Sequence, residues 1–210
     1  MTRTSMALTQ IETSVSMSGE PVTKSTSQQI NTLRLNKDAL NRTSWLHDSH
    51  IQVAIEDIEK YGEIKNESTL YVVPSLSHFI KCAPQNDVET QLNKNNATLK
   101  SHMVFTVNDC KGDLGSGEGS HWSLLIYERK RNTWYHVDSG GNANAPHAER
   151  IMDKVNKYLV KQGILVNANT DYVVCRCTQQ RNGYDCGPLA ILFAKKICKM
   201  IARGYPLHTC

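Results

Sequence analysis

The sequence lacks several features that mark common classes of protein. No apolar run approaches the ~18 residues that a membrane-spanning helix needs, and no cationic segment followed by an apolar one opens the chain. Basic residues outnumber acidic ones by only 24 to 20, and no basic stripe interleaved with aromatic side chains suggests a nucleic-acid interface. We therefore expect neither a membrane nor a nucleic acid as a partner.

Metal and nucleotide signatures are also missing. The seven cysteines are odd in number and irregularly spaced. Cys175 and Cys177 could supply two ligands of a zinc site, but the sequence has neither a His pair nor a second close Cys pair to supply the other two. The glycine-rich segment Asn108–Ser120 lacks the spacing G-x-G-x-x-G and a following Gly-Lys-Ser/Thr. We expect no metal, no cofactor, and a reduced intracellular protein of the cytoplasm or the nucleus.

Two regions of the chain differ in composition. Residues 1–31 are rich in Ser, Thr and Gln without a sustained apolar period, which predicts a disordered tail. Residues 32–210 carry the patterns of one α+β domain, in which helices flank a mostly antiparallel sheet. Residues 84–100 are polar and support no assignment. The expected elements are a helix after Ser44 that ends before Gly62, strand 70–73, helix 75–82, strands 103–107, 122–127 and 133–138, helix 148–159, strand 172–177 and helix 188–203.

The segment Gln179–Gly187 places a cysteine at a turn directly before a helix. Asn182-Gly183 is a strong turn signal, and Pro188 opens an apolar segment of helical length. Cys186 therefore lies at a helix N-terminus, where unpaired N–H groups and the helix macrodipole favour a thiolate. A buried cysteine without a chemical role fits this segment equally well.

A predicted hairpin favours the first of these interpretations. A loop within Glu128–Asn132 places His121 opposite, or nearly opposite, Asp138 across the two strands. A carboxylate beside an imidazole orients the ring and stabilises its charged form, as the base of a cysteine nucleophile requires. Because the last strand leads directly to Cys186, we predict that these three side chains form one active site.

These motifs resemble those of the Ulp/sentrin-specific cysteine proteases, which remove ubiquitin-like modifiers from proteins. The similar segments lie in order over roughly residues 37–200: Trp45-Leu46-His47-Asp48, His121-Trp122, Asp138, and Gln180-x-Asn182-x-x-Asp185-Cys186-Gly187. Val104–Asp109 and the glycine-rich segment before His121 look most like the deneddylase branch of that family. The resemblance implies a papain-like, Ulp-type fold.

The resemblance also implies a role for each matched catalytic position. Cys186 corresponds to the nucleophile and His121 to the general base and acid. Asp138 corresponds to the partner that orients His121. Gln180 matches the side-chain donor of the oxyanion hole.

Other matched positions concern the substrate. Trp45 and Trp122 match two tryptophans that line a narrow tunnel for the modifier's Gly-Gly tail, since only glycines are thin enough to pass between two flat rings. Asp48 matches a contact with a basic residue of the modifier. The chain departs from the family pattern where His47 replaces an asparagine and where Pro188 replaces an apolar residue that has an N–H group.

The expected function is the removal of a ubiquitin-like modifier, in the first place the neddylation modifier, from lysines of conjugated proteins. The same chemistry would trim the modifier's precursor after Gly-Gly, and we expect the enzyme to act as a monomer. SUMO or ubiquitin as the modifier is the main alternative. An acetyltransferase with the same catalytic residues and an inactive binding module are two others; the paired tryptophans disfavour the former, and the complete catalytic set disfavours the latter.

Overall fold

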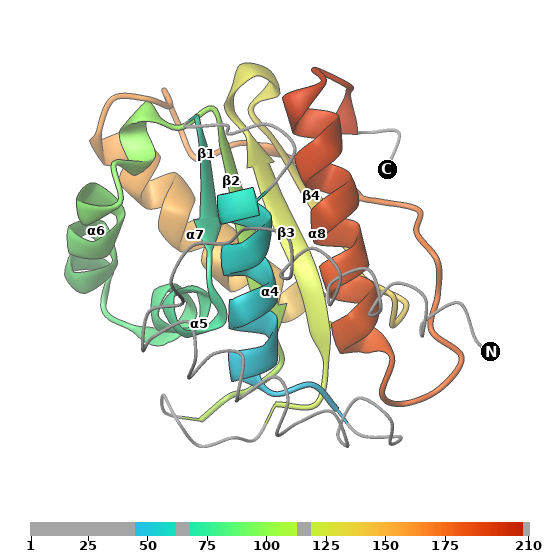
Figure 1. The fold of residues 1–210 in the computed structure, drawn as a ribbon. Helices are drawn as coiled ribbons and strands as arrows, with labels where there is room; N and C mark the ends of the chain where they lie inside the picture. Colours follow the sequence, from blue (N-terminus) through green and yellow to red (C-terminus); the bar gives the residue numbers. More distant parts are fainter. Residues whose placement is uncertain (1–44, 62–67, 113–118, 208–210) are drawn as a thin grey trace, which may run out of the picture. The chain divides into compact units, whose positions relative to one another are not determined.

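A computed structural model describes residues 45–61, 68–112 and 119–207 (Figure 1). The predicted tail 1–31, the predicted cap Ser44 and the predicted stop Gly62 lie outside the described residues. The described elements are, in chain order, α4 Asp48–Tyr61, β1 Thr69–Val72, α5 Pro74–Cys82, α6 Gln85–Lys94, the 3₁₀ turn η1 Ala97–Leu99, β2 His102–Asn108, β3 Trp122–Glu128, the 3₁₀ turn η2 Arg129–Arg131, β4 Thr133–Val137, α7 Ala145–Lys161, β5 Asp171–Val174 and α8 Cys186–Ala202.

The strands of the described residues form one five-stranded sheet in the order β1-β2-β3-β4-β5. β2, β3 and β4 pair antiparallel, whereas β1 and β5 each run parallel to the strand beside them. The predicted α+β class is confirmed, but the sheet is mixed rather than mostly antiparallel. The connections explain the difference: helices join β1 to β2 and β4 to β5, and such crossovers permit parallel pairing, whereas a short turn joins β3 to β4.

Helices pack on both faces of this sheet (Figure 1). On one face α8 packs against β3 and α4 packs against α8. The opposite face meets α7, whose Ile151 and Val155 join Phe105, Leu125 and Trp134 in one buried cluster. The strand residues of this cluster alternate with residues that face α8, which is the period of two expected for a sheet buried on both faces.

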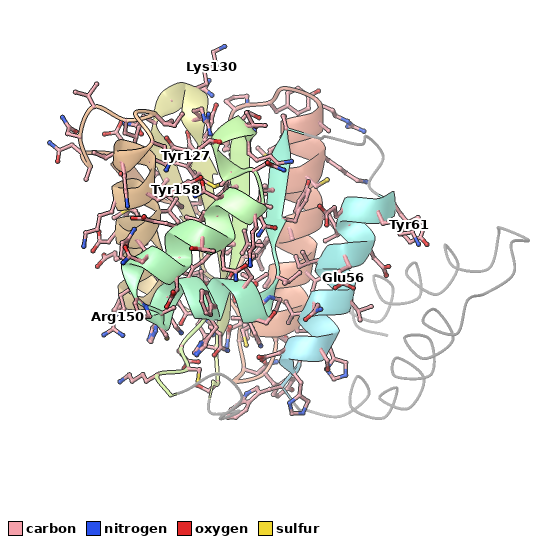
Figure 2. All side chains as sticks on the ribbon, turned by 90° about the vertical axis from the view of Figure 1, so that its left-hand side faces the viewer. Glu56, Tyr61, Tyr127, Lys130, Arg150 and Tyr158 are labelled. Atoms are coloured by element: carbon pink, nitrogen blue, oxygen red, sulfur yellow. The ribbon has the colours of Figure 1, made fainter. Side chains whose placement is uncertain are left out.

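The layer between the sheet and α7 and the periphery of the domain can be followed from individual side chains (Figure 2). Tyr127 of β3 and Tyr158 of α7 are fully buried and lie inside the layer between sheet and helix. Lys130 in the β3–β4 turn and Arg150 on α7 lie exposed at the periphery. None of the described helices is long and apolar enough to cross a bilayer.

Several elements differ from the sequence-based expectation, among them α4, α6 and β5. The unassigned stretch contains α6, which buries Val88 and Leu92, four residues apart, so its polar composition concealed a one-sided helix. α4 begins at Asp48, because the backbone carbonyl of His47 accepts the bonds of the first turn. β5 ends at Val174 rather than at residue 177, since the chain then leaves the sheet to approach the turn after β4.

Candidate active site

The two ends of one hairpin and the start of the last helix meet at one end of the sheet. His121 immediately precedes β3, Asp138 immediately follows β4, and Cys186 opens α8. The register pairs Leu124 with Val137, so His121 reaches Asp138 diagonally across the hairpin. Nε2 of His121 lies 2.6 Å from Oδ1 of Asp138, which confirms the predicted meeting of these two side chains.

Asp138 is a buried carboxylate, and both of its oxygens accept hydrogen bonds. Its Oδ1 accepts hydrogen bonds from His121 and from the backbone N–H of Gly140 at 2.7 Å, and its Oδ2 accepts one from the backbone N–H of Asn144 at 2.9 Å. Burial raises the pKa of Asp138, but these hydrogen bonds outweigh it and hold the pKa below its ordinary value. The carboxylate is therefore charged beside the histidine.

The imidazole of His121 is positioned between this carboxylate and the thiol. Burial opposes a positive charge on the ring, but hydrogen bonds to Asp138 and Cys186, together with their charges, raise the pKa of His121 to about 9. Because Nε2 faces Asp138, Nδ1 is the ring atom that remains for the thiol. A charged imidazole at neutral pH is the form that can donate a proton to a leaving group.

Cys186 is fully buried at the first position of α8. Its Sγ lies 3.9 Å from the backbone oxygen of Ser120. The preceding turn is built by Asn182, whose Oδ1 accepts hydrogen bonds from the backbone of Tyr184 and Asp185, at 3.1 and 2.9 Å. The predicted turn is confirmed, and so is the place of Cys186 at a helix N-terminus, although α8 begins at Cys186 itself rather than at Pro188.

The two predicted tunnel tryptophans are linked by the segment before α4. The indole N–H of Trp45 donates to the backbone oxygen of Gly183, in the turn that precedes Cys186. The indole N–H of Trp122 donates to the backbone oxygen of Leu46 at 2.9 Å. Trp45 is 51% exposed and Trp122 only 4%, so one ring is presented to solvent and the other forms part of the interior. Asp48 lies exposed at the first position of α4.

Gln180 is held by the turn that follows Asp138. Its backbone N–H donates to the carbonyl of Ser139 at 2.9 Å, and its Oε1 accepts from the hydroxyl of Ser139 at the same distance. Its Nε2 donates to the backbone oxygen of Asn182 at 2.8 Å. A primary amide has two N–H groups, so this bond accounts for one of them.

Two residues that the sequence reasoning missed complete the setting of His121. The side-chain amide of Asn144 donates to the backbone oxygens of Val107 and His121, and its backbone N–H donates to Asp138, so it joins strand, base and carboxylate. A Cβ on Gly140 would lie 2.6 Å from the His121 ring, so only glycine fits there. The signals were present as the Gly140-Gly141 pair and as an asparagine before a helix, but each also fits an ordinary turn or cap.

The arrangement suits acyl transfer. A cysteine at a helix N-terminus, a histidine within its reach and a buried carboxylate behind that histidine activate a thiol for attack on a carbonyl. Among the described residues, no three His, Cys, Asp or Glu side chains gather in a way that would hold a metal ion. The fold and this combination of side chains define a cysteine protease.

Comparison with known proteins makes the assignment specific. Residues 44–202 match the Ulp1 protease family, C-terminal catalytic domain, and the chain belongs to this family. It is 26% identical over 170 residues to sentrin-specific protease 8 of Mus musculus, covering 80% of this chain and 74% of that protein. It is 28% identical over 174 residues to NEDD8-specific protease 1 of Arabidopsis thaliana, covering 81% and 73%.

A solved structure is similar in fold. The C-terminal Ulp1 protease domain in complex with Smt3, the yeast ortholog of SUMO, superposes with a TM-score of 0.57 at 21% identity, over 79% of this chain and 69% of that one. The predicted Ulp-type fold is thereby confirmed.

Proposed function

We propose that this protein is an isopeptidase that releases a ubiquitin-like modifier, NEDD8 in the first place, from lysine side chains, and that it also trims the modifier's precursor after Gly-Gly. We further propose that it acts as a monomer, without a cofactor, in the cytoplasm or the nucleus. The observation that carries the proposal is the bond from Trp45 to Gly183, which places an indole beside the turn that presents Cys186. Relatives named as NEDD8-specific proteases support the choice of modifier.

The proposed reaction begins at the carbonyl of the modifier's C-terminal glycine. The thiolate Sγ of Cys186 adds to the carbonyl carbon and forms a tetrahedral intermediate, which collapses as the bond from that carbon to the lysine nitrogen breaks. His121 gives its proton to the leaving amine, and a thioester remains. His121 then removes a proton from water, which attacks the thioester and releases the modifier's carboxylate and the thiol.

Two donors would stabilise the oxyanion of each tetrahedral intermediate. They are the second N–H of the Gln180 amide and the backbone N–H of Cys186, each worth on the order of 3 kcal/mol in a preorganised site. Gln180 is anchored by Ser139, next to Asp138. Pro188 lies in the first turn of α8, where a backbone N–H has no intrahelical acceptor, so the helix forms without that donor.

The proposal is tested with C-terminally activated NEDD8, SUMO and ubiquitin, each carrying a thiol-reactive group. We expect NEDD8 to label the full chain fastest and at Cys186, as judged by a gel shift and by mass spectrometry of the modified peptide. Cys186→Ala should abolish labelling, whereas Cys82→Ala, which alters an exposed cysteine on α5, should not. Faster labelling by SUMO or ubiquitin would refute the choice of modifier, and labelling by none of the three would refute the isopeptidase.

A further inference from the structure

Asp109, directly after β2, binds the backbone on which His121 is mounted. Its Oδ1 accepts hydrogen bonds from the backbone N–H groups of Ser120 and His121, at 2.7 and 2.9 Å. Its Oδ2 accepts a third, from the hydroxyl of Ser120, at 2.7 Å. One carboxylate therefore clamps two successive residues at the entrance to β3.

The clamped peptide touches the proposed nucleophile from two sides. The carbonyl oxygen of Ser120 lies 3.9 Å from Sγ of Cys186. The ring of His121 lies between the thiol and Asp138. A displacement of this one peptide would move the base and the carbonyl beside the thiol together.

A buried lysine holds the backbone on either side of Asp109. Nζ of Lys81, on α5, donates to the backbone oxygens of Asn108 and Cys110, at 2.7 and 2.6 Å, on either side of Asp109. Lys81 is only 5% exposed, and a buried ammonium group requires such acceptors. The side-chain amide of Asn108 also donates to the carbonyl of His121 at 3.2 Å, so N–H and C=O of the histidine are both held from the end of β2.

We infer that Asp109 is a positioning residue for the proposed reaction. Its carboxylate fixes the backbone of Ser120 and His121, and thereby holds the His121 ring at the distance from Cys186 that proton transfer needs. The inference rests on the proposed function, since it assigns His121 the transfer of a proton. The hydrogen bonds that Asp109 accepts come from Ser120 and from the backbone of His121 and not from Cys186. Its effect is exerted through His121.

Three substitutions at Asp109 separate positioning from charge. Asp109→Ala removes all three acceptors and should lower kcat by about 10²-fold, since a shift of about 1 Å in a catalytic group has that effect, while KM changes little. Asp109→Asn keeps Oδ1 for both backbone N–H groups, and the Ser120 hydroxyl can accept from the new amide, so most of kcat should return. Asp109→Glu keeps the charge but adds a methylene group, and should lose kcat like the alanine variant.

The matched control is Asp153→Ala, an exposed aspartate on α7, which should leave kcat and KM unchanged. Thermal unfolding of every variant monitors the fold. Should Asp109→Ala unfold, the contrast between the asparagine and glutamate variants decides the question.

A second measurement does not need the modifier. The rate at which iodoacetamide alkylates Cys186, followed by mass spectrometry of its peptide, should fall in Asp109→Ala and Asp109→Glu and recover in Asp109→Asn. Wild-type rates in the folded glutamate variant, or an asparagine variant as slow as alanine in both assays, would overturn the inference. If the wild-type protein is alkylated at Cys186 but cleaves no conjugate of NEDD8, SUMO or ubiquitin, the proposed function is refuted instead. The alkylation rates of the variants would still test the role of Asp109.

Discussion

Replacing Asp138 by asparagine tests the central electrostatic feature of the site. The substitution keeps the size of the side chain and removes its charge. Three donors converge on the carboxylate: the ring of His121 and the backbone N–H groups of Gly140 and Asn144. An asparagine has a single side-chain oxygen, so at least one donor must face its NH₂ group.

The magnitude follows from the charge on the ring. The carboxylate and the thiol raise the pKa of His121 from its ordinary value of 6.5 to about 9, which corresponds to about 3 kcal/mol in favour of the charged form. Without the carboxylate the pKa of His121 falls from about 9, because burial lowers it and only Cys186 still raises it; a return to the ordinary value of 6.5 sets the scale of the effect. At pH 7.5 the charged fraction would fall from about 97% toward about 10%, so kcat/KM should fall about 10-fold from this cause alone.

The sign of the pH dependence is also determined. The charged ring is lost as pH rises through its pKa, so activity that needs a proton for the leaving amine declines on the alkaline side. We expect this decline near pH 9 in the wild type and, in Asp138→Asn, displaced toward pH 6.5.

The assay is the rate of modifier release from a lysine conjugate between pH 5.5 and 9.5, paired with an NMR titration of the His121 ring. Asp153→Asn makes the same charge change at an exposed position on α7 and should leave the profile unaltered. An alkaline decline that stays near pH 9 in Asp138→Asn would refute the electrostatic argument.

Three further predictions concern two glycines at the site and the pairing of Asp138 with His121. Gly140→Ala places a Cβ 2.6 Å from the His121 ring and should lower kcat about 10²-fold without unfolding the protein; normal steady-state kinetics would contradict this. Gly187→Ala places a Cβ 2.8 Å from Leu46 and should cost about 1–3 kcal/mol of unfolding free energy in urea titrations, as overpacking does; a cost below ~0.5 kcal/mol would show that the contact relaxes freely. The stabilisation that Asp138 provides by pairing with His121 should be complete below pH 6.5 and disappear as pH rises through about 9, so a stability difference between wild type and Asp138→Asn that is constant over this range would count against the pairing.

Much of the site could be predicted because its signals are local. The turn at Asn182 and the apolar segment after it indicate where α8 begins, and hence where Cys186 lies. The β3–β4 hairpin is also local: a short turn between two strand-like segments sets the register, and the register brings His121 to Asp138. Each inference needs only residues within one supersecondary unit.

Other features depend on contacts between distant segments. The parallel pairings of β1 and β5 were missed, because the direction of an edge strand depends on how a helical crossover packs, and no short pattern records it. α6 was missed because its few apolar residues acquire meaning only when Val88 and Leu92 meet the core. The placement of Trp45 beside Gly183 joins positions 138 residues apart.

By itself the sequence determined which side chains are available for chemistry and which short elements carry them: a cysteine at the start of a helix, and a histidine and an aspartate across one hairpin. Only the tertiary structure decided how those side chains are held in place. The side chains of Asp109 and Asn144 act on the backbone N–H and C=O groups of His121. Every residue except proline carries both groups, so a hydrogen bond to them from a distant side chain leaves no trace in the residue types that it connects.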